Sequence, residues 1–194
     1  MYIIGLDLSL TGTGVVILNP DKIKNGNAEP AIALSKLIKS RPQGKGPQIE
    51  IKRMMKIVDE ILKYVQQYAN LHPQDGTFAV IEGIAFSARN TSCLAQLAGL
   101  NYLVRGTLLN AGIPFVIVQP STLKKFVTGK GIGQKDLMML ELFKRWNITS
   151  ADNNVGDAAG LALAGAALTG DRLTVPKFQR EVLELLESQY TKKL

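Results

Sequence analysis

The sequence from Tyr2 to Leu18 reads YIIGLDLSLTGTGVVIL, and this stretch decides the fold. The run from Tyr2 to Leu8 is apolar and β-branched, which is typical of a buried strand. A turn of Ser, Thr and Gly follows at 9–14, and residues 15–18 predict a second strand. Asp7 stands inside the first apolar run, where an ionised carboxylate costs free energy unless it is paired or binds a metal.

Strands and helices alternate further along the chain. Residues 32–38 predict a third strand of an antiparallel meander, after a polar loop at 21–30, and a long amphipathic helix follows, with Ile51, Met54 and Val58 at helical spacing. The other predicted elements are strands at 77–81 and 113–118, and helices at 91–110, from 120 to a break at 129–133, and at 135–146, 156–168 and 177–190. This order predicts an α/β fold in which parallel strands extend the meander into a mixed five-stranded sheet with helices on both faces.

The composition predicts one globular domain over residues 1–194, since 46% of the residues are hydrophobic and 20% are charged. One cysteine and one histidine exclude an internal disulfide and leave a Cys/His zinc site almost without donors. The chain opens without a secretory signal, and no apolar run approaches the ~20 residues that span a bilayer. We therefore expect a soluble, cytoplasmic protein with no membrane partner.

The net charge of +7 favours a polyanionic partner, because Lys and Arg neutralise phosphates and release counterions. This signal is weak alone, since many basic proteins bind no nucleic acid. Charge alone therefore does not identify the function, and the motifs carry more information.

Acidic residues mark the ends of three predicted elements. Besides Asp7, Glu82 ends the apolar strand before Gly83, and Asp157 opens a helix of small and apolar residues. Three such acids suggest one site at the carboxyl edge of the sheet, with the hard oxygen donors that suit Mg²⁺ or Mn²⁺. Two ions there can activate a water and stabilise the leaving oxygen in phosphodiester cleavage.

Each acid also has a structural interpretation. Asp7 can accept hydrogen bonds from the turn at 9–14, Asp157 can be the N-cap of its helix, and Glu82 can pair with Arg89. All three together, each at the end of an element, favour the metal site.

The motifs resemble those of RuvC-type Holliday junction resolvases, in the order of that family. Residues 5–14 (GLDLSLTGTG) resemble its opening strand and turn, 80–83 (VIEG) its second acidic strand, and 153–162 (NNVGDAAGLA) its final acidic helix. The stretch from 120–126 (PSTLKKF) to 129–135 (GKGIGQK) matches its lysine-bearing segment. The four motifs together span nearly the whole chain.

This resemblance implies an RNase H-like fold and a crossover junction endodeoxyribonuclease of DNA recombination and repair. It implies a homodimer whose two active sites, each with two Mg²⁺ or Mn²⁺ ions, nick a four-way DNA junction in pairs. By position, Asp7, Glu82 and Asp157 would hold the metal ions. Lys124 and Lys135 match family lysines near the scissile phosphate, and Lys135 is the predicted catalytic lysine.

Some positions depart from the family pattern or have an ordinary structural explanation. The family's fourth metal ligand falls at Asn154, an uncharged residue, and Asp152 is the nearest acid that can replace it. Lys125 and Lys130 are predicted to contact DNA, but an ordinary solvated basic face explains them nearly as well. The glycines at 129–133 are expected to keep their loop mobile until DNA orders it.

The segment after Glu82 is predicted to touch the junction. Phe86 falls near an aromatic wedge of the family, with one extra residue in between, and a core phenylalanine is an equal alternative. Arg89 and Asn90 can bind backbone phosphate. The small residues and leucines of the next helix, 91–110, fit a dimer seam, although packing on the sheet predicts the same pattern.

Three other functions agree with parts of the sequence. A phosphotransferase of the actin and sugar-kinase superfamily shares the opening loop but needs a second domain to close over ATP. A junction-binding protein without catalysis is conceivable because of Asn154. A nuclease of flaps, forks or RNA–DNA hybrids would keep the metal site and change only the substrate.

Overall fold

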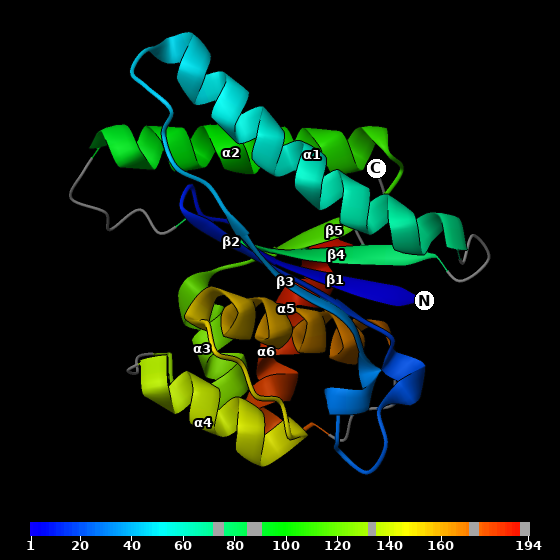
Figure 1. The fold of residues 1–194 in the computed structure, drawn as a ribbon. Coiled ribbons are helices and arrows are strands. Elements are labelled where there is room, and N and C mark those ends of the chain that lie inside the picture. Colours follow the sequence, from blue (N-terminus) through cyan, green and yellow to red (C-terminus); the bar gives the residue numbers. More distant parts are fainter. Residues whose placement is uncertain (72–75, 85–90, 132–134, 171–174, 191–194) are drawn as a thin grey trace.

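The computed structural model describes residues 1–71, 76–84, 91–131, 135–170 and 175–190. In this part of the chain, five strands form one sheet in the order β3-β2-β1-β4-β5, with helices on both faces (Figure 1). The strands are β1 (Tyr2–Asp7), β2 (Gly12–Leu18), β3 (Ile32–Lys39), β4 (Thr77–Glu82) and β5 (Phe115–Val118). The helices are α1 (Pro47–Leu71), α2 (Thr91–Asn110), α3 (Pro120–Thr128), α4 (Lys135–Trp146), α5 (Asn153–Thr169) and α6 (Lys177–Tyr190).

The sheet is mixed, as the sequence predicts. Strands β1, β2 and β3 pair antiparallel, while β4 runs parallel to β1 and β5 parallel to β4. The carboxyl ends of β1, β4 and β5 therefore lie at one end of the sheet, together with the start of β2 and the end of β3. We call this the carboxyl end of the sheet.

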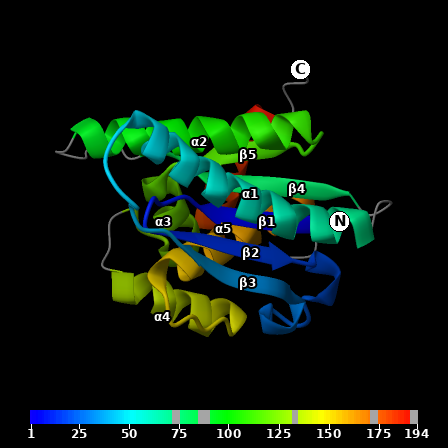
Figure 2. The ribbon, with the colours of Figure 1, turned by 45° about the horizontal axis from the view of Figure 1, so that its top comes forward.

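Alternating side chains divide the core into two layers. Ile3, Val16 and Phe78 pack with α5 and the other carboxyl-terminal helices, whereas Ile4 and Leu6 pack with α1 and α2. Both views show α1 and α2 over one face of the sheet, with α3, α4 and α5 on the other side (Figures 1 and 2). The sheet is thus covered on both faces, as in other α/β proteins with parallel strands.

Helix α5 lies directly on the sheet because glycines face it. A β-carbon on Gly5 would lie 1.9 Å from the carbonyl oxygen of Ala158, and one on Gly14 would lie 2.1 Å from that of Asn154. These distances leave no room for any side chain. The two glycines therefore set the depth and the direction of the first turns of α5.

Several element boundaries differ from the sequence prediction. Strand β2 begins at Gly12 instead of residue 15, because Gly12 and Thr13 pair with Lys39 and Ile38 of β3. Helix α5 begins at Asn153, where Asp152 is the N-cap. The prediction that Asp157 opens this helix was wrong, and so was its alternative role as the N-cap.

The loop segments hold more local structure than their composition suggests. The polar loop after β2 contains two 3-10 turns, η1 (Pro20–Lys22) and η2 (Glu29–Ala31). Gly129, expected in a mobile loop, instead caps α3 with φ +78°, and its amide donates to the carbonyl of Lys125.

One edge of the sheet is covered by a side chain. The amide of Gln189 on α6 accepts a hydrogen bond from the backbone N–H of Ile117 and donates one to its carbonyl, both at 3.2 Å. Gln189 thus occupies the place that a neighbouring strand would take beside β5. Among the described residues, no helix has the length and apolar character needed to cross a membrane.

Candidate active site

Strands β1 and β4 bring Asp7 and Glu82 together. Leu6 is paired with Ile81, so one step further the parallel register places Asp7 beside Glu82. Ile3 and Phe78 pack in the layer beneath α5, and each lies four residues before one of these acids. Because side chains alternate along a strand, both acids project on the α5 side of the sheet.

Helix α5 adds the third acid at the same end. Asp157 lies in its second turn and precedes Ala158, whose carbonyl touches Gly5 of β1. Asp7 is buried, at 6% exposure, and Glu82 and Asp157 are half-buried. The amino-terminal end of a helix favours nearby negative charge, so α5 stabilises acids placed there.

All three acids have interaction partners within the fold. In the described ranges, no three His, Cys, Asp or Glu side chains already form a cluster that could hold a metal ion. The backbone thus gathers the acids at one end of the sheet without closing their side chains around a common point.

The two residues predicted as alternative fourth ligands differ in position. The carboxylate of Asp152 accepts a 2.9 Å hydrogen bond from the backbone N–H of Asn154 and so serves as the helix cap. The side-chain amide of Asn154 donates a 2.6 Å hydrogen bond to the carbonyl of Gly12, at the start of β2. Asn154 therefore ties α5 to the turn that follows Asp7. Its amide nitrogen makes this hydrogen bond, and its amide oxygen takes no part in it.

The turn after Asp7 is held by its own hydroxyl groups. The backbone N–H groups of Thr11 and Gly12 donate to the Oγ of Ser9, and that of Ser9 donates to the Oγ1 of Thr13. These three amides thus donate to hydroxyl groups of the turn itself. The alternative interpretation of the sequence was that amides of this turn donate to Asp7.

Sequence reasoning missed two polar residues that support this end of the sheet. The guanidinium of Arg53 on α1 donates to the carbonyl of Leu10 and to both the Oγ (3.0 Å) and the carbonyl (3.2 Å) of Ser40. Asn101 on α2, only 2% exposed, donates to the carbonyl of Glu82 at 3.1 Å. The signal was a polar residue among the apolar positions of a helix, which sequence alone does not distinguish from an exposed edge.

The predicted lysines lie in different surroundings. Lys124 on α3 is half-buried, and Lys130 is exposed just beyond the cap of that helix. The ammonium of Lys125 lies 2.9 Å from the carboxylate of Glu181 on α6, and this hydrogen bond and charge hold the pKa of Glu181 below its ordinary value. Lys125 thus has an ionic partner within the fold.

The remaining predicted residues carry less structural information. Lys135 is the first residue of α4, but its side chain lies outside the described part. Phe86, Arg89 and Asn90 also lie outside the described residues, and with them the suggested pair of Glu82 and Arg89.

The strand order and the helices on both faces are those of an RNase H-like fold. No family model matches the chain. Crossover junction endodeoxyribonuclease RuvC of Synechococcus sp. (strain CC9311) is 27% identical over 169 residues, covering 85% of this chain and 98% of that protein.

Two solved structures share the fold. Thermus thermophilus RuvC in complex with a Holliday junction substrate has a TM-score of 0.64 at 18% identity, covering 84% of this chain and 91% of that one. A second Thermus thermophilus RuvC structure has a TM-score of 0.61 at 19% identity, covering 84% and 92%. These similarities confirm the resemblance to RuvC-type resolvases that the motifs predict.

Proposed function

We propose that this chain is a crossover junction endodeoxyribonuclease, which resolves four-way DNA by hydrolysing phosphodiester bonds. The observation that carries the proposal is the meeting of β1, β4 and α5, which brings Asp7, Glu82 and Asp157 to one end of the sheet in a RuvC-type chain. A DNA substrate also agrees with the net charge of +7 and with the predicted cytoplasmic location.

The chemistry of the donor groups at this end suits a divalent metal ion, which would draw the three carboxylates together on binding. Carboxylate oxygens from three separate elements, with the amide oxygen of Asn154 nearby, form the hard donor set that Mg²⁺ or Mn²⁺ prefers. Two such ions per site would supply an activated water and stabilisation of the leaving oxygen. The buried strand holds Asp7 in place, and the close fit of α5 at Gly5 and Gly14 holds Asp157 in place.

The lysine-bearing segment after β5 would bring positive charge to the proposed site. We assign Lys124 and Lys135 to the scissile phosphate, where an ammonium can hold the phosphate and stabilise the charge that develops during cleavage. We also assign Lys130, exposed beyond the Gly129 cap, to a DNA contact.

Two nicks across one junction require two active sites, so we propose a homodimer. Helix α2 exposes Tyr102 (67%) and Leu103 (37%) while Leu100 packs in the core of its own chain. Of the leucines of this helix that are predicted for a dimer seam, Leu97 and Leu103 can contact a partner, whereas Leu100 is buried in its own chain.

The decisive experiment is a nicking assay on a synthetic four-way junction, with linear duplex, flap and RNA–DNA hybrid as controls, in Mg²⁺, Mn²⁺ or EDTA. We expect symmetric paired nicks on the junction in Mg²⁺ or Mn²⁺ and none in EDTA. Cleavage mainly of flaps or hybrids would support the assignment of the active site but overturn the four-way junction as its substrate. Tight junction binding without cleavage in either metal would overturn the proposal that the protein is an enzyme. Asn154→Asp would then test whether the uncharged residue at the fourth ligand position is the cause.

A further inference from the structure

A basic groove lies away from the three acids, between α1 and the end of β3. It encloses about 540 Å³ and is formed by the last residues of β3, the segment 40–43 and the first half of α1. Its walls carry five basic residues: Lys39, Arg41, Lys52, Arg53 and Lys56. The carboxyl-terminal part of the groove along α1 carries two acids, Asp59 and Glu60, so the basic residues are in excess.

The charge of this groove is not neutralised within the fold. Lys39, Arg41, Lys52 and Lys56 are exposed, and in the described part of the chain none of them forms an ion pair. Lys52 and Lys56 are four residues apart on one helix, an arrangement of like charges that destabilises the helix slightly. An anionic ligand would relieve this repulsion.

The groove is part of the framework rather than a loose surface. Arg53, in its wall, is held by Leu10 and Ser40, and the backbone N–H of Ser40 donates to the carbonyl of Thr11 at 3.1 Å. The segment that forms one wall is thereby bonded to the turn that follows Asp7. A ligand in the groove would therefore be held at a fixed position relative to the proposed active site.

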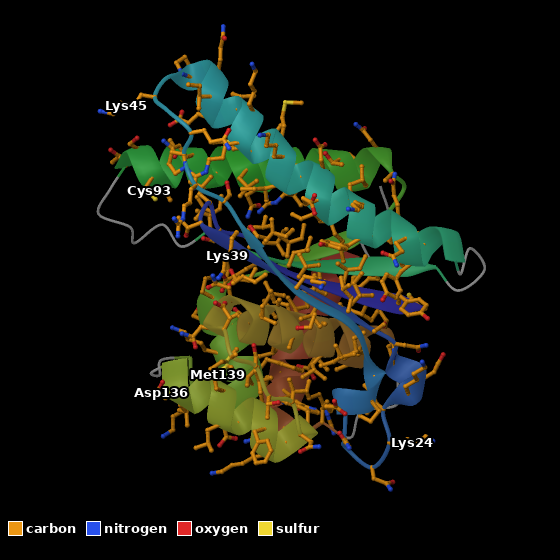
Figure 3. The ribbon with its side chains drawn as sticks, in the orientation of Figure 1. Lys24, Lys39, Lys45, Cys93, Asp136 and Met139 are labelled. Carbon is orange, nitrogen blue, oxygen red and sulfur yellow. The ribbon has the colours of Figure 1, made fainter. Side chains whose placement is uncertain are left out.

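The groove opens beside the carboxyl end of the sheet. Lys39 is paired with Gly12, and Gly14 with Asp7, so Lys39 and Asp7 stand at the same end of the sheet, two strands apart. Two strand spacings, combined with the two-residue offset between Gly12 and Gly14 along β2, amount to roughly 12 Å. That distance corresponds to about three to four nucleotide steps along the axis of a duplex. Figure 3 shows Lys39 and Lys45 on the same side of the molecule, with Lys24 at the opposite end.

We propose that this groove binds the sugar-phosphate backbone of a DNA arm, at least about three nucleotides from the scissile phosphate. Its apolar floor, which includes Ile49 and Ile57, suits the deoxyribose faces, while Lys39, Arg41, Lys52 and Lys56 neutralise phosphates. The assignment rests on the proposed function, since it takes the DNA cut at the three acids to continue into the groove. An acidic peptide would fit the charge equally, but the rigid link to the turn after Asp7 favours the substrate of that site.

The test compares two variants that remove equal charge. The groove variant carries Lys39→Gln, Lys52→Gln and Lys56→Gln. The control carries Lys22→Gln, Lys24→Gln and Lys63→Gln, which replace exposed lysines outside the groove. Binding to a four-way junction and to linear duplex is measured in EDTA from 50 to 200 mM salt, thermal unfolding checks the fold, and Lys→Arg at the three groove positions tests rescue.

Each phosphate contact contributes about 0.9 to the slope of log affinity against log salt, so the groove variant should lose about 2 to 3 from its slope. Over this salt range, the wild type should then lose about 40-fold more affinity than the groove variant. The control and the Lys→Arg variant should keep the wild-type slope, or nearly so.

Neutral methylphosphonate linkages locate the contact. When they are placed in one arm beyond the third nucleotide from the crossover, they should lower the affinity of the wild type for the junction. They should not lower the affinity of the groove variant, which has already lost this contact. A wild-type slope in the folded groove variant, or equal losses in both proteins on the modified arm, would overturn the proposal. Wild-type nicking in Mg²⁺, measured in parallel, reports the proposed function separately, because the binding result stands whether or not the junction is cut.

Discussion

The contact between Gly5 and α5 predicts a large effect of a single methyl group. In Gly5→Ala, the new β-carbon would lie 1.9 Å from the carbonyl oxygen of Ala158 and 2.7 Å from the amide nitrogen of Ala162. Both obstacles are backbone atoms, so no rotamer change relieves them and α5 must retreat by about 1 Å. Overpacking of this kind costs about 1–3 kcal/mol, and the rigid obstacle places this substitution near the upper value.

The displacement should affect both stability and cleavage. For a chain of this size, about 3 kcal/mol lowers the melting temperature by roughly 6–12 °C. Because Asp157 moves with α5, a shift of about 1 Å should also slow cleavage roughly 100-fold under conditions in which the protein is folded. Differential scanning fluorimetry and single-turnover nicking of a saturated four-way junction measure the two effects.

Gly170→Ala is the matched control, because a β-carbon at this C-cap of α5, where the backbone is extended at φ −160°, meets only the carbonyl oxygen of Ala166, at 3.7 Å. It should leave the melting temperature and the cleavage rate unchanged. A Gly5→Ala protein with wild-type stability and cleavage would mean that α5 does not lie against β1 as described. The placement of Asp157 at the carboxyl end of the sheet would then be wrong as well.

Other substitutions test the remaining parts of the structure. Asp7→Asn should abolish cleavage and leave junction binding intact, as measured by nicking and gel shift; cleavage at the wild-type rate would reject the metal site. Lys135→Ala should slow cleavage more than it weakens binding, and a loss confined to affinity would make Lys135 a general phosphate contact. Leu97→Glu should yield monomers in analytical ultracentrifugation, and a dimeric mutant would refute the α2 seam. Arg53→Lys should lower the free energy of unfolding by about 1.5–3 kcal/mol, because an ammonium cannot make all the hydrogen bonds of the guanidinium; an unchanged value would show that this link contributes little.

The strand and helix order could be predicted because its signals are local. The apolar runs that became β1 and β4 have short, β-branched patterns, and α1 has a clear helical period. The errors lie at boundaries. Helix α5 begins at Asn153 because Asp152 caps it, a choice that depends on a hydrogen bond between neighbouring residues rather than on the apolar pattern.

The site was predictable only in part. The three acids stand out because each occupies an otherwise apolar element, and the described fold places all three at one end of the sheet. Arg53 and the basic groove could not be predicted, because they depend on contacts between distant segments: Arg53 and Leu10 are 43 residues apart in the chain. No local sequence pattern predicts a contact between segments so far apart in the chain.

The side chain of Gln189 beside β5 has a consequence for association between chains. An uncovered edge strand presents free N–H and C=O groups, which invite a strand from another molecule and lead to aggregation. With its amide on Ile117, Gln189 removes one such pair from the β5 edge. The opposite edge, β3, carries Lys36 and Lys39, and charged side chains also discourage strand addition there. The two edges thus resist unwanted sheet extension by different means, which leaves association of this protein to its helical surfaces.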